Sequence, residues 1–191
     1  MNIVTRYAVT YGGLSGIVII AIIITGLQFA DRVSFTGSEW FGYLVMLSAL
    51  SFIFVGVKRF RDVERGGVIG FAAALGIGAA IAVVAALAYV IVWEIYLAAT
   101  NYAFMDQYVA GIREAKRAAG LTGEALARAM APMEDMRAQY RNPLFRVLIT
   151  FLEIAPVGLL VALVSAALLR NPRFLPASRA LFPINRMGIA T

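Results

Sequence analysis

The sequence predicts an all-α fold, a four-helix transmembrane bundle with a short extramembrane helical hairpin between spans three and four. Of its 191 residues, 61% are hydrophobic and 15% are charged, whereas a soluble domain is about 45–50% apolar and about 25% charged. The apolar residues gather in four stretches, each near the roughly 20 residues that cross a bilayer core. Because backbone polar groups in lipid must pair within their own segment, these stretches are expected to be helices.

The four spans are expected at residues 8–29, 40–57, 68–96 and 144–169. The first stretch is longer than the apolar core of a signal peptide and is followed by no small-x-small cleavage site. We therefore expect an uncleaved anchor. Residues 1–170 form one membrane domain in this interpretation, and a basic cytoplasmic tail follows at 171–191.

The charge distribution predicts the orientation. A juxtamembrane basic loop follows the second span, and its charged residues are Lys58, Arg59, Arg61, Asp62, Glu64 and Arg65. The positive-inside rule places this loop, the tail and both termini in the cytoplasm of a multi-pass membrane protein. The third connection carries seven cations, but long connections follow the rule less well. The basic loop is expected to face anionic lipids at the cytoplasmic surface.

Small residues predict close packing of the spans. In span three a stripe recurs every four residues: Gly70, Ala74, Gly78, Ala82 and Ala86. Span one adds the pair Gly12 and Gly16. Helices in lipid associate mainly where small side chains let their backbones approach. We expect span three to be the central helix, packed against other spans of the same chain rather than against a second copy.

Two acidic residues lie inside predicted spans. Glu94 is near the end of span three, and Glu153 lies in span four, three residues before Pro156. Carboxylates in hydrocarbon are costly and mark functional sites by default. One interpretation is a proton or cation site shared by the two acids; the other is structural pairing with local polar groups. Arg146 is a candidate counter-ion for Glu153, although the two lie about two helical turns apart.

The segment 101–142 is expected to hold two amphipathic helices that cap the outer face or lie in the interface. The first runs from Asp106 to Ala119, and Gly120 closes it. Thr122 is expected to cap the second, which Asn142-Pro143 ends. The spacing of Met130, Met133 and Met136 suits either packing or Cu(I). Since the chain has no histidine and no cysteine, we predict neither a metal nor a cofactor.

Several short motifs resemble a known family. They are FVGVKRFRD at 54–62, the glycine pair at 66–67, and EIAPVGLLVALVSAALL at 153–169. Together they resemble a bacterial membrane family catalogued as domain of unknown function 4199 (DUF4199), over roughly Arg6 to Arg170. The resemblance implies four spans and no particular activity. It marks five positions for inspection: Lys58, Arg61, Asp62, Glu153 and Pro156.

The sequence predicts a structural role, or one in protein or lipid interaction. No catalytic triad, phosphate loop or metal-ligand cluster is present, so no enzyme is expected. The alternative is an oligomeric carrier or channel subunit for protons or cations that uses Glu94 and Glu153. The expected partners are the bilayer and either a second copy or another membrane protein. Nucleic acid is not expected, because the basic residues border the membrane and no recognition motif appears.

Overall fold

The computed structural model describes the backbone of residues 2–29 and 39–177 and the side chains of residues 2–22, 47 and 50–177. These ranges form helices and connections and contain no strand, which confirms the all-α class. The helices are α1 (Ile3–Phe29), α2 (Glu39–Glu64), α3 (Phe71–Ala99), α4 (Phe104–Ala118), α5 (Gly123–Tyr140) and α6 (Pro143–Leu169).

Three of the described helices are long and apolar enough to cross a membrane: α1 over Ile3–Ile22, α3 and α6. The predicted second span, 40–57, lies within α2, and half of its side chains fall outside the described part of the chain. A fourth span therefore stays a prediction. The basic tail lies mostly outside the described residues, since these end at residue 177.

The segment predicted as a basic loop is helical. α2 continues to Glu64, and the chain turns at Gly66 and Gly67, whose φ angles are +62° and +87°. Left-handed backbone of this kind suits glycine, which has no Cβ to clash. Because the turn ends only after these glycines, α3 starts at Phe71 and not at residue 68.

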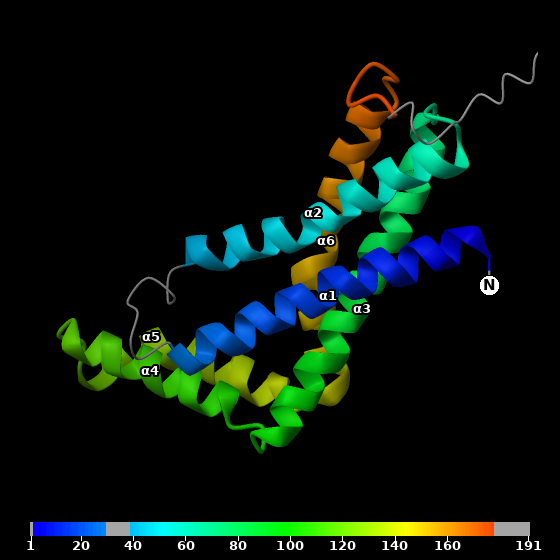
Figure 1. Cartoon of the computed structure of the whole chain (residues 1–191). Helices are drawn as coiled ribbons and strands as arrows, with labels where there is room; N and C mark the ends of the chain where they lie inside the picture. Colours follow the sequence, from blue (N-terminus) through cyan, green and yellow to red (C-terminus); the bar gives the residue numbers. More distant parts are fainter. Residues whose placement is uncertain (1, 30–38, 178–191) are drawn as a thin grey trace, which may run out of the picture.

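Helix α3 is the centre of the bundle, with α1 and α6 against it. In Figure 1, α1 and α2 lie side by side and cross α3 and α6 obliquely. The close approaches occur at glycines: a Cβ at Gly78 would lie 2.9 Å from Ala162, and one at Gly16 would lie 2.6 Å from Ala88. The predicted stripe is buried from Ala74 onward, but Gly70 lies before the helix and is exposed.

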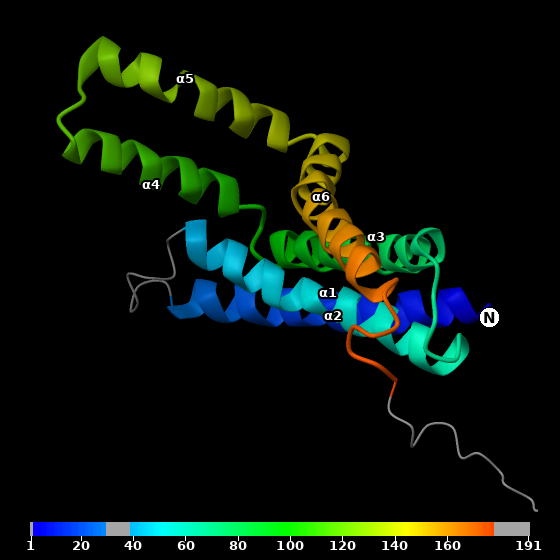
Figure 2. The ribbon, with the colours of Figure 1, turned by 90° about the horizontal axis from the view of Figure 1, so that it is seen from above.

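Helices α4 and α5 form the predicted hairpin. It projects sideways from the end of the bundle where α3 finishes and α6 begins (Figures 1 and 2). Its interior includes Val109 and Met130, both buried. An ion pair between Arg113 and Glu134 joins the two helices. Thr122 occupies the N-cap position of α5, but its side chain makes no capping hydrogen bond, unlike the prediction.

Candidate functional site

One polar cluster lies at the end of α2, and we call Lys58, Arg61 and Asp62 the α2 cluster. Arg61 is fully buried. Its Nε donates to Asp62 at 2.7 Å, and its other nitrogens donate to the backbone carbonyls of Phe174 and Leu175. Lys58 Nζ reaches the second carboxylate oxygen of Asp62 at 2.6 Å. The cluster therefore fastens the segment after α6 to the end of α2.

The Asp62 carboxyl is held in its charged form. Burial raises its pKa, but the hydrogen bonds from Arg61 and Lys58 outweigh burial, and the net pKa lies below the ordinary aspartate value. A buried arginine needs such a partner, because an unpaired charge in a low-dielectric interior is costly. The expectation of a lipid-facing loop is wrong for Arg61 and Asp62, which are buried; Arg59 is exposed.

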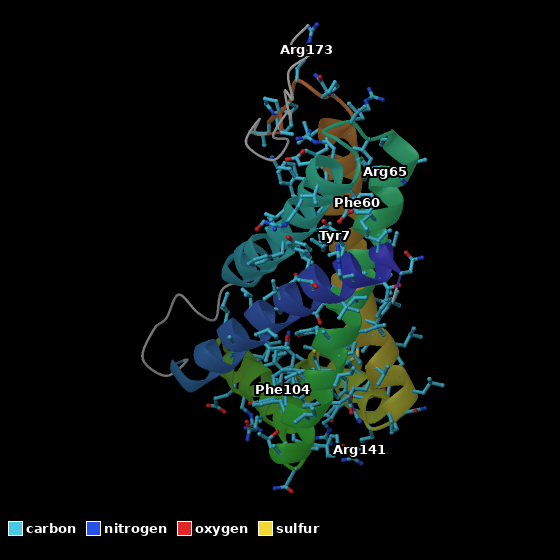
Figure 3. All side chains as sticks on the ribbon, turned by 45° about the vertical axis from the view of Figure 1, so that its right-hand side comes forward. Tyr7, Phe60, Arg65, Phe104, Arg141 and Arg173 are labelled. Carbon is cyan, nitrogen blue, oxygen red and sulfur yellow. The ribbon has the colours of Figure 1, made fainter. Side chains whose placement is uncertain are left out.

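The start of α1 joins the same end of the molecule. Arg6 and Tyr7 both donate to Glu64 on α2, at 3.1 and 3.0 Å. The Tyr7 ring packs edge-on against Phe60, with ring centroids 5.3 Å apart. Figure 3 shows Tyr7 and Phe60 at this end. The first turns of α1, the end of α2 and the segment after α6 thus meet in one place.

A second polar cluster lies at the other end, and we call it the Glu94–Arg146 cluster. Arg146 forms a bidentate ion pair with Glu94, with N–O distances of 2.6 and 2.7 Å. Its remaining nitrogen donates to the Tyr140 carbonyl at 3.1 Å. Its guanidinium lies 4.7 Å from the centroid of the Tyr102 ring. The suggested pairing of Arg146 with Glu153 is wrong: Arg146 is committed to Glu94.

Glu153 has no such partner. It is exposed on α6, and no hydrogen bond or ion pair reaches it from the described part of the chain. Pro156, one turn further along, is also exposed. Glu94 is paired with Arg146, so the two carboxylates lie in different polar environments, and a site that they share stays a prediction.

A cavity of 420 Å³ lies at the foot of the hairpin, beside Arg146. Its lining residues are Asn101, Tyr102, Met105, Asp106, Arg137, Tyr140, Arg141, Pro143 and Arg146. The Tyr140 hydroxyl accepts a hydrogen bond from Trp93 Nε1 at 2.8 Å, and burial raises the pKa of this tyrosine. We call this the hairpin cavity. It contains three arginines, one acid and several apolar surfaces, so it can bind an anion with an apolar portion.

The described residues contain no group of three or more His, Cys, Asp or Glu side chains that could hold a metal ion. The three methionines considered for Cu(I) lie on α5, where Met130 is buried in the hairpin. This burial is what packing requires.

The chain matches a known family over most of its length. A family model described as Protein of unknown function (DUF4199) matches residues 6–171. The chain belongs to this family. No curated protein and no solved structure matches this DUF4199 protein. Residues 54–62, which carry the resemblance noted in the sequence, include the α2 cluster, and in the structure this cluster joins α2 to the segment after α6.

Two arrangements in this DUF4199 protein were not predicted from its sequence. One is the pairing of Glu94 with Arg146, which are 52 residues apart in the chain. The other is the position of Tyr102 and Tyr140, which flank the Arg146 guanidinium. A usable signal was present: an arginine a few residues inside an apolar span requires an acidic partner, and Glu94 was the acid nearest to the same predicted interface.

Proposed function

We propose that this protein is a four-span integral protein of the bacterial inner membrane with both termini in the cytoplasm. We further propose that it has a structural or interaction role and no enzymatic activity. Three described apolar helices support the membrane assignment. The antiparallel order of α1, α2, α3 and α6 supports an even number of crossings, because the start of α1 and the segment after α6 lie at one end.

The observation that carries the interaction role is the hairpin. It is joined to the bundle at its base and otherwise stands apart from it (Figure 2). Tyr108 on α4 is 53% exposed, and the hairpin also has exposed charged residues, such as Arg117 and Arg128. In contrast, the buried charges Arg61, Asp62 and Arg146 all have partners within the chain. A closed, internally paired bundle with an exposed helical arm is suited to contacting other molecules.

Orientation is testable with single cysteines, because the chain has none of its own. Gln107→Cys lies on the exposed surface of α4, and Asn171→Cys follows α6 at the opposite end. In intact cells, a membrane-impermeant maleimide is expected to label Gln107→Cys from the outside and to label Asn171→Cys only after the membrane is opened. The reverse pattern would invert the topology, and labelling of both positions from one side would show that α6 does not cross the membrane.

The interaction role is testable with a photo-crosslinking residue at position 108. A discrete protein or lipid adduct is expected in native membranes. Leu160, 57% exposed on α6, gives a matched control position that should yield only bulk-lipid adducts. The interaction role is contradicted if both positions give the same adducts and the purified protein alone conducts ions.

A second candidate function is a carrier for protons or cations. Glu153 is the acid that it would use, because Glu94 is paired with Arg146. The observation that favours it is the exposed carboxyl of Glu153 on an apolar helix, which no side chain in the described ranges pairs with. Such a site would require a second copy to enclose it. Proton flux into liposomes that Glu153→Gln abolishes would support this candidate, and flux absent from the unmodified protein would remove it.

A further inference from the structure

The hairpin cavity has an excess of positive charge at its mouth. Arg146 is neutralised by Glu94. Arg137 is shared between Glu134 at 3.1 Å and Asp106 at 3.7 Å. Arg141 also lines the cavity, but it is exposed and no acid in the described chain pairs with it. One cation is therefore available to a ligand at this position.

The lining of the cavity also includes a tight backbone turn at Asn101 and Tyr102 and the apolar side chains of Met105 and Pro143. Asn101 and Tyr102 adopt left-handed backbone, with φ angles of +51° and +57°. The Tyr102 backbone N–H donates a hydrogen bond to the Leu97 carbonyl at 2.7 Å. The Tyr102 ring packs against the Arg146 guanidinium. Met105 and Pro143 complete the lining. The volume of 420 Å³ falls within the roughly 300–1,000 Å³ typical of small-molecule sites.

The position of the cavity identifies the type of ligand. Pro143 is the first residue of α6, so in the proposed membrane placement the cavity lies where this helix enters the apolar layer. Directly beyond it, Leu144 is 75% exposed and Leu148 is 54% exposed. Figure 3 shows Arg141 at this end, opposite Tyr7. A ligand with a phosphate at Arg141 and acyl chains along α6 would match both surfaces.

We propose that the hairpin cavity binds the phosphate-bearing headgroup of an anionic phospholipid, with Arg141 as the cation that contacts the phosphate. This inference rests on the proposed membrane placement and names a lipid partner for the interaction role. It also accounts for part of the excess of cations in the segment between α3 and α6, which the positive-inside rule does not explain.

The test is a lipid titration of the full-length protein in detergent, followed by native mass spectrometry. Phosphatidylglycerol is expected to bind at one saturable site, and phosphatidylcholine more weakly. Arg141→Gln should weaken the phosphatidylglycerol affinity about fivefold, the value for one cation near an anionic surface. Arg128→Gln removes an equal charge from an exposed position on the same hairpin and should leave the affinity unchanged.

Met105→Trp supplies a second variant, because it fills the cavity without changing charge. Met105→Trp should also weaken phosphatidylglycerol binding. Thermal unfolding checks that Arg141→Gln and Met105→Trp remain folded. Equal losses from Arg141→Gln and Arg128→Gln would overturn the proposal in favour of diffuse attraction. Competition by soluble glycerol phosphate at matched concentration would assign the site to a free anion and overturn the lipid assignment. Neither result would alter the cysteine-labelling test of topology.

Discussion

Arg61 combines full burial with three contacts: an ion pair with Asp62 and hydrogen bonds to two backbone carbonyls of the segment after α6. The planar guanidinium suits this arrangement, because its donors point in fixed, separate directions. Lysine has the same charge but cannot reach a carboxylate and two carbonyls at once. This explains in physical terms why an arginine, and not merely a cation, is useful at this position.

Arg61→Ala is expected to lower the free energy of unfolding by about 3–5 kcal/mol, because it leaves Asp62 and two backbone carbonyls without their main donor. The measurement is thermal or denaturant unfolding of the purified protein in detergent. Arg59→Ala is the control: Arg59 is its near neighbour on α2 but is exposed, so its loss should cost under about 1 kcal/mol. Equal effects of the two substitutions would contradict the anchoring role.

Asp62 gives the bundle a predictable response to acid. Its folded pKa is below the ordinary value, so its stabilising effect is complete above the unfolded pKa of about 4. This contribution is lost as pH falls through the lower folded pKa. The difference in melting temperature between the unmodified protein and Asp62→Asn should therefore be largest near neutral pH and shrink in acid. A difference that is independent of pH would show that Asp62 acts without its charge.

Hydropathy predicts the positions of the apolar helices better than it predicts where the polar ends of the helices lie. Apolar run length located α1, α3 and α6, and Gly120 and Asn142 correctly marked ends in the hairpin region. The continuation of α2 through residues 58–64 was missed. Cations at a span boundary usually face water, and only the three-dimensional structure brings the Phe174 and Leu175 carbonyls to Arg61. Long-range polar pairing of this kind leaves no local periodicity to detect.

The packing of α3 gives a prediction with an internal control. A Cβ at Gly78 would lie 2.9 Å from Ala162 on α6, whereas a Cβ at Gly76 meets nothing within 4 Å. Gly78→Ala should therefore destabilise the protein by about 1–3 kcal/mol through overpacking. Gly76→Ala should be neutral or slightly stabilising, because alanine is the better helix former. Unfolding measured in detergent checks both, and similar values for the two would mean that α3 and α6 do not pack as described.

The two polar clusters together bind the ends of the bundle. The α2 cluster and Glu64 connect α1, α2 and the segment after α6. The Glu94–Arg146 cluster connects α3, α6 and the end of α5. Between them lies a layer of small side chains packed around α3. The carrier hypothesis required two available acids, and this arrangement occupies one of them. Both acids were visible in the sequence, but their different environments depend on contacts between distant helices.

The environment of Glu153 indicates whether the protein is a monomer or an oligomer. In the single chain its carboxyl is exposed on an apolar helix, where an acid is costly. If nothing covers it, Glu153→Leu should raise the free energy of unfolding by roughly 1–3 kcal/mol, measured as thermal unfolding in detergent. Glu124→Leu removes the same charge from an exposed position on the hairpin and should change little. If Glu153→Leu instead lowers stability and converts an oligomer to monomers by intact mass, a second copy covers the carboxyl, and the carrier becomes the stronger candidate.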